Sequence, residues 1–178
     1  MGVKGIQRFR CSRCPHRLTY LKGEPRQEGY IVLQFGQQYC TAGKKYRMFK
    51  KKDPKIYPPN WCPKLKKPCE FRVYDFKDAN TWYLHTLLKR KSPPDGYQYA
   101  VRLSGTVNLT PSAFFSMAKR KGASELLGVM VKIGEIVEID DGLTSNCFYL
   151  TLSGVKYLPY WDTARARKNE YACKNSDN

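Results

Sequence analysis

Five of the seven cysteines lie in the first 69 residues, and their placement constrains the fold more than any other feature of the sequence. They are Cys11, Cys14, Cys40, Cys62 and Cys69. No apolar run at the start resembles a secretory signal, so we expect a cytoplasmic protein, where disulfides are rare and grouped cysteines usually bind metal. An odd total also does not fit a complete set of disulfides. The sequence therefore predicts a metal-stapled N-terminal module.

The spacing of these cysteines indicates a structural zinc site. Cys11 and Cys14 form a Cys-x-x-Cys loop, which directs two thiolates into one hollow, and Cys62 opens a second Cys-Pro step. We favour Cys40 as the fourth ligand, with Cys69 as a substitute, because Cys69 could instead face a hydrophobic core. An iron–sulfur cluster uses the same ligands, but the lack of several such loops in tandem favours zinc. The competing interpretation is a set of buried free cysteines.

Positive charge is concentrated in the same region. Residues 1–78 carry 19 Lys and Arg against 6 Asp and Glu, a net of +13, whereas residues 79–178 carry 13 against 9, a net of +4. Such a surface attracts polyanions. The cations are interleaved with aromatic residues rather than placed on a basic amphipathic helix, which favours nucleic acid over a membrane.

The densest basic stretch follows Cys40 and continues past Cys62. Its cations could contact phosphates, while Tyr46 or Phe49 could stack on unpaired bases. Core packing is an equally good interpretation for these two rings. The candidate nucleic-acid-binding residues are Lys44, Lys45, Tyr46, Arg47, Phe49, Lys50, Lys51, Lys52, Lys64, Lys66 and Lys67.

The pattern of the N-terminal part, residues 1–77, predicts a loop-rich module with short strands. Residues 1–29 read as irregular, and residues 29–35 and 69–76 as strands. In the second strand Cys69, Phe71 and Val73 alternate with Glu70, Arg72 and Tyr74, so the two sets should occupy opposite faces.

Residues 78–178 read as an α+β domain with an antiparallel hairpin and two or three helices. Asp78 should cap a helix over 79–91 whose apolar stripe is Leu84, Leu87 and Leu88. A strand is expected at 97–103, a helix from Pro111 to Lys121, and a hairpin over 129–153 with one long strand to Ile139. Asp162 should cap a final basic helix.

Together these features predict a non-catalytic, zinc-stabilised protein that binds DNA, RNA or a ribonucleoprotein, with no membrane or small-molecule partner. An alternative is an inhibitor or adaptor of a nucleic-acid enzyme, of the kind that phages and mobile elements encode against CRISPR nucleases. Another alternative is a metal-dependent nuclease that uses Glu135, Glu138 or Asp140. Salt-dependent affinity, nuclease-resistant pull-down and cleavage assays separate the three.

Overall fold

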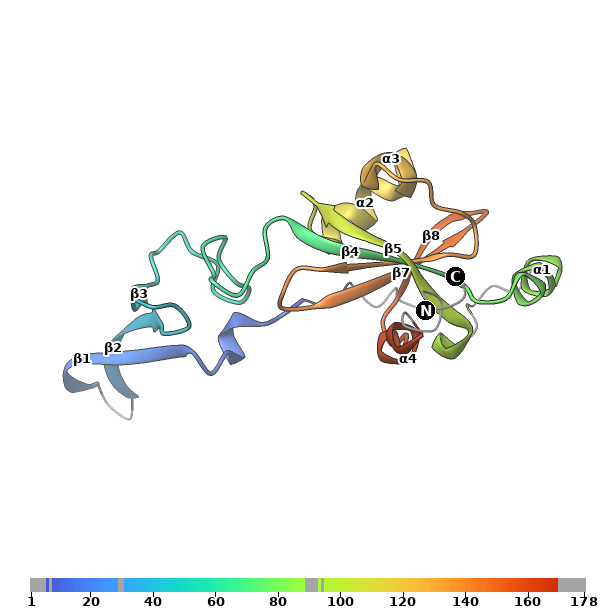
Figure 1. The fold of residues 1–178 in the computed structure, drawn as a ribbon. Helices are drawn as coiled ribbons and strands as arrows, with labels where there is room; N and C mark the ends of the chain where they lie inside the picture. The colour runs from blue at the N-terminus through green and yellow to red at the C-terminus, as the bar shows by residue number, and fades with distance from the viewer. Residues whose placement is uncertain (1–5, 7, 29–30, 89–92, 94, 170–178) are drawn as a thin grey trace. The chain divides into compact units, whose positions relative to one another are not determined.

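The computed structural model describes residues 6, 8–28, 31–88, 93 and 95–169 (Figure 1). The chain forms two compact units, and each is described by itself. We call Arg8–Leu65 the basic unit, and Met1–Gln7 with Lys66–Asn178 the sheet unit. The strand that begins at Cys69 belongs to the sheet unit, whereas the sequence pattern had grouped it with the N-terminal module.

The basic unit contains a three-stranded antiparallel sheet in the order β1-β2-β3. A short 3-10 turn, η1 (Cys11–Arg13), precedes it. The strands are β1 (Arg17–Glu28), β2 (Ile31–Cys40) and β3 (Arg47–Met48).

Strand β1 corrects the expectation that residues 1–29 are irregular. It pairs with β2 from Arg17 opposite Cys40 to Glu28 opposite Ile31, with a register shift between Lys22 and Arg26. Its side chains Leu18, Tyr20 and Leu21 are all exposed. The described side chains from Leu18 to Leu21 are all exposed, so this stretch has no alternation of buried and exposed residues for the sequence pattern to reveal.

The sheet unit is built on five antiparallel strands in the order β5-β4-β6-β7-β8. They are β4 (Cys69–Phe76), β5 (Tyr99–Val107), β6 (Ile136–Asp140), β7 (Ser145–Thr151) and β8 (Gly154–Leu158). A mixed α+β fold with antiparallel sheets is therefore confirmed. The short 3-10 turn η2 (Gly96–Gln98) leads into β5.

Helices cover both faces of this sheet (Figure 1). On one face α2 (Pro111–Lys121) and α3 (Ala123–Leu127) pack on a core that includes Phe71, Val137 and Phe148. On the other face α4 (Thr163–Lys168) packs on Tyr74, Tyr99, Ile136 and Tyr149. The predicted alternation along β4 is confirmed, because Cys69, Phe71 and Val73 join the first core and Tyr74 the second.

The expected helix starts are also confirmed. Thr110 Oγ1 accepts a hydrogen bond from Ala113 N at 3.3 Å, Pro111 is the first residue of α2, and Gly122 ends the helix at φ 84°. The Asp162 carboxylate accepts from two amides at the start of α4.

Helix α1 (Ala79–Leu87) begins where expected but presents a different face to the core. The Asp78 carboxylate accepts hydrogen bonds from Asn80 N and Thr81 N. However, Leu84 and Leu87 are 54% and 61% exposed, and His85 is the buried residue, with its ring 5.8 Å from that of Phe76. The apolar stripe does not face the core, because the aromatic side chains of β4 and β7 accept the imidazole instead.

The long strand expected over 129–139 is shorter in the structure. Strand β6 begins only at Ile136, because Gly134 adopts φ 93° and Glu135 N donates back to Lys132 O at 3.2 Å. The hairpin itself is confirmed, with β6 paired to β7 from Ile136 opposite Tyr149 to Asp140 opposite Ser145. Strand β8 and helix α3 were not anticipated.

In the part of the chain that the structure describes, no helix has the length and apolar character needed to cross a bilayer.

Candidate functional site

Backbone contacts join the cysteine-bearing segments of the basic unit. Thr41 N, next to Cys40, donates to His16 O at 2.9 Å, which attaches the end of β2 to the chain that leaves Cys14. Ser12 N donates to Ile56 O at 3.3 Å, which attaches η1 to the Pro-rich loop that leads to Cys62. Gly43 lies against Pro63, since a Cβ built there would be 3.8 Å from the proline ring. All three segments are therefore held against one another.

Two of these segments also form tight turns around their cysteines. Cys14 N donates to Cys11 O at 3.1 Å, and Arg17 N donates to Cys14 O at 3.0 Å. In the second loop, Leu65 N donates to Cys62 O at 3.2 Å. These backbone hydrogen bonds restrain the local conformation of the chain at Cys11, Cys14 and Cys62.

The thiols of this unit lie in and around one small buried cluster. Cys11 and Cys40 are buried together with Phe49, and Trp61 packs against them. Burial raises the pKa of the Cys11 thiol, Arg17 opposes that rise, and the Cys14 and Cys62 thiols add to it. None of the six described cysteines is in a disulfide.

Cys69 occupies a different environment. It is 6% exposed in the core of the sheet unit, with Phe71 and Val107, and this burial raises the pKa of its thiol. The sequence pattern allowed this location for Cys69 as the alternative to metal binding. Cys147 is likewise buried in β7, and Cys173 lies outside the described residues.

Among the residues that the structure describes, no three His, Cys, Asp or Glu side chains form a group that could hold a metal ion. The zinc site therefore stays a prediction. The contacts between the cysteine-bearing segments are what the structure adds to it.

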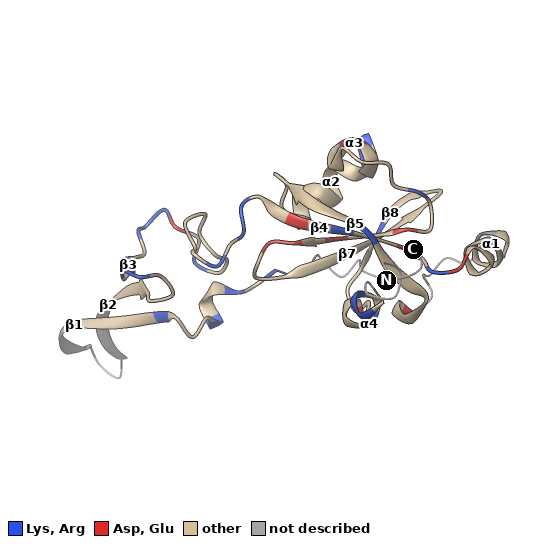
Figure 2. Cartoon of the chain, in the orientation of Figure 1, with Lys and Arg blue, Asp and Glu red and all other residues tan. Residues whose placement is uncertain are grey.

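The predicted basic surface is largely exposed. Figure 2 shows Lys and Arg along the loops on either side of β3. The basic unit holds fourteen Lys and Arg against three Asp and Glu, a net of +11. Tyr46 is 77% exposed among these cations. The exposed cations of this stretch are Lys44, Lys45, Arg47, Lys50, Lys51, Lys52 and Lys64.

Three of the predicted residues lie elsewhere. Phe49 is 9% exposed, with its ring 5.1 Å from that of Trp61, so it packs in the core and is not offered to a base. Lys66 and Lys67 belong to the sheet unit. Lys66 Nζ is 2.9 Å from Glu70 and 3.3 Å from Asp140, so acidic partners already neutralise its charge.

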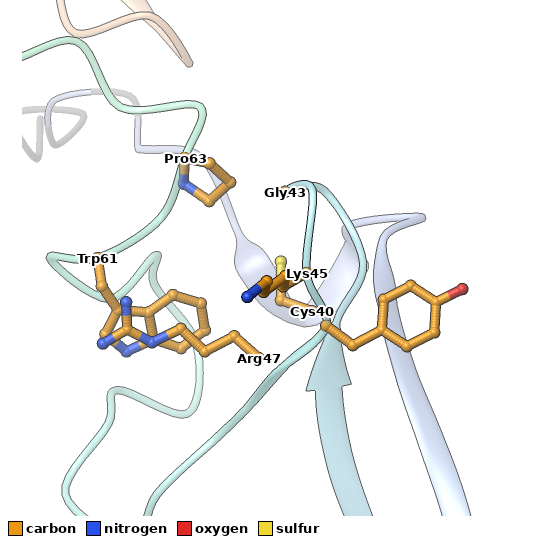
Figure 3. Close-up of a pocket in the computed structure, with 7 residues that line it drawn as sticks. Cys40, Gly43, Lys45, Arg47, Trp61 and Pro63 are labelled. Carbon is orange, nitrogen blue, oxygen red and sulfur yellow. The ribbon is translucent and has the colours of Figure 1, made fainter.

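A hollow of about 310 Å³ opens between the loop after β2 and the loop before Cys62 (Figure 3). The residues of its walls include two cations and the indole of Trp61, and none of them is an acid. The guanidinium of Arg47 lies over the indole of Trp61, 4.5 Å from the ring centroid. The residues that line it are Cys40, Gly43, Lys45, Tyr46, Arg47, Trp61 and Pro63.

The indole in this hollow is fixed by a carboxylate. Trp61 Nε1 donates to Asp53 Oδ1 at 3.1 Å, and Lys50 N donates to Asp53 Oδ2 at 2.8 Å. The bond from Lys50 N, with a smaller effect from Trp61, holds the pKa of Asp53 below its ordinary value. Sequence reasoning missed Trp61 as a site residue, although its position beside Cys62 was a usable signal.

The carboxylates considered for a nuclease are engaged in the sheet unit. Glu138 is fully buried and binds Tyr74, Ser145 and Arg167. Glu135 is 1% exposed, and its Oε1 is 2.6 Å from Arg102 Nε. Two carboxylates that arginines already hold in the interior are poorly placed to bind a catalytic metal ion at a surface.

The comparisons give this chain no relative, because no family model, no curated protein and no solved structure matches it.

Proposed function

We propose that this chain is a non-catalytic nucleic-acid-binding protein that binds through the basic unit. The observation that carries the proposal is the excess of exposed cations over acids there. With fourteen cations and three acids, the unit carries a net charge of +11. A cluster of such cations binds phosphate backbones by releasing condensed counterions.

The proposal includes a structural zinc ion held by Cys11, Cys14, Cys40 and Cys62. It is supported by the hydrogen bonds that join the three segments and by the burial of Cys40 beside Cys11. Four thiolates close the coordination sphere, so the ion stabilises the fold and does not bind substrate.

The small size of the described hydrophobic cluster supports the proposal that an ion stabilises this unit. Among the side chains of the basic unit that the structure describes, Cys11, Cys40 and Phe49 form the buried cluster, with Ala42 and Trp61 against it. Domains of about 60 residues are marginally stable even with a normal core. A metal ion supplies the missing stabilisation in many small domains.

The experiment that tests the function is a salt titration of affinity. Labelled single-stranded and double-stranded DNA and RNA are titrated with the whole protein at several salt concentrations, with fluorescence anisotropy as the readout. We expect log Kd to rise linearly with log salt, with a slope of about 0.7 to 0.9 for each phosphate contacted. Removing exposed cations, as in the double variant Lys51→Gln/Lys52→Gln, should lower this slope by about 1 to 2.

A matched charge removal in the sheet unit is the control. Lys119→Gln/Arg120→Gln takes two cations from the end of α2 and should leave the slope unchanged. An affinity that does not depend on salt, or equal effects of the two double variants, would contradict the proposed function.

A further inference from the structure

The hollow beside β3 combines positive charge with an aromatic face. Lys45 and Arg47 bring the positive charge, and Trp61 brings the aromatic face. Its volume of about 310 Å³ lies at the lower end of the range of small-ligand sites, which suits one small unit rather than a long groove.

The Arg47–Trp61 pair is already arranged for binding. A guanidinium that stacks on an indole keeps its N–H donors in its own plane, where they can reach a phosphate, and the Arg47 side chain is exposed to solvent. The indole cannot turn away easily, because Asp53 holds its Nε1 and Lys50 N holds Asp53. Little side-chain freedom is therefore lost when a ligand binds.

We infer that this hollow binds one unpaired nucleotide of a single strand, with its phosphate on Lys45 and Arg47 and its base stacked on the Arg47–Trp61 pair. The inference rests on the proposed function and adds a preference for unpaired bases. A base inside a duplex is stacked on both sides and has no free face for these groups.

The test compares a normal single-stranded oligonucleotide with an abasic one of the same length and phosphate number. Both are titrated with the whole wild-type protein and with Arg47→Lys. The substitution keeps the positive charge but loses the planar group, so it separates stacking from phosphate binding. Lys51→Gln is the matched control, since it removes an exposed charge that does not line the hollow.

We expect the wild type to bind the normal strand roughly tenfold more tightly than the abasic strand, as one stacked base provides. Arg47→Lys should lose most of that difference and keep its affinity for the abasic strand. Lys51→Gln should weaken both strands by the same factor. Equal affinity of the wild type for the two strands, or a base preference that survives in Arg47→Lys, would overturn the inference and leave the proposed function standing. If the wild type bound none of the nucleic acids in a salt-dependent way, that result would instead reject the proposed function.

Discussion

The two units of this chain obtain their stability in different ways. The sheet unit buries aromatic and aliphatic side chains on both faces of a five-stranded sheet, and it pairs its interior acids with arginines. In the basic unit the described side chains form a buried cluster of Cys11, Cys40 and Phe49, and its cations outnumber its acids by eleven.

This difference indicates that the two units depend on different sources of stability. Unpaired positive charge destabilises a compact unit through self-repulsion, so a unit retains it at a cost in stability. A metal ion can offset that cost without covering the surface with hydrophobic contacts. The comparison therefore predicts that the two units respond differently to the same perturbations.

The largest expected effect is that of chelation. Structural zinc contributes on the order of 10 kcal/mol to the folding of small metal-bound domains, so its removal should unfold the basic unit. Hydrogen–deuterium exchange should then show loss of amide protection in β1 and β2, while β6 and β7 keep theirs. The predicted difference between the units would be contradicted if a chelator left the amides of β1 and β2 protected, or if both units lost amide protection equally.

A smaller effect is expected from matched deletions of one buried ring in each unit. Phe148 is fully buried, with its ring 5.2 Å from that of Phe114, so Phe148→Ala should lower the free energy of unfolding of the sheet unit by about 3–5 kcal/mol. Phe49→Ala should lower that of the metal-loaded basic unit by less than about 2 kcal/mol, because the small cluster carries less of its stability.

Hydrogen exchange at increasing urea concentration measures the free energy of unfolding of each part separately. Amides of β6 report on the sheet unit, and amides of β2 report on the basic unit. A larger loss in Phe49→Ala than in Phe148→Ala would show that the basic unit depends on its core after all.

The smallest expected effect is a local response to acid at Asp53 of the basic unit. The Asp53 carboxylate, held by Lys50 N and Trp61 Nε1, has a folded-state pKa below its ordinary value of 3.8. Its stabilising contribution is therefore fully present above pH 3.8 and is lost as the pH falls through the folded-state pKa. In an NMR titration the indole N–H signal of Trp61 should move over that range.

Trp82 provides an internal control in the sheet unit, because its indole donates to a backbone carbonyl, Ile133 O, at 3.3 Å. Its signal should stay constant while that of Trp61 moves. In Asp53→Asn the Trp61 signal should no longer titrate, and a Trp61 signal that is constant in the wild type would count against the Asp53 contact.

The sequence predicted the sheet unit best, because local rules determine much of it. Helix caps at Thr110 and Asp162 depend on residues only a few positions away, and the alternation in β4 follows from its two buried faces. The pattern did not show which face of α1 is buried, since that depends on aromatic side chains of other strands.

The basic unit was harder to predict for a physical reason. Its strand β1 has exposed side chains such as Leu18 and Tyr20, so there is no periodic pattern to detect. The candidate cysteines and lysines could be chosen from spacing and composition. The stacking of Arg47 on Trp61 joins residues fourteen positions apart across two loops, and it required the folded structure.

The central claim is that thiols of the basic unit, and not the thiol of the sheet-unit core, hold one metal ion. Elemental analysis of purified wild type, Cys62→Ala and Cys69→Ala by mass spectrometry tests it most directly. The account predicts one zinc per chain in the wild type and in Cys69→Ala, and none in Cys62→Ala. A metal-free wild type, or zinc that persists in Cys62→Ala and is lost in Cys69→Ala, would contradict it.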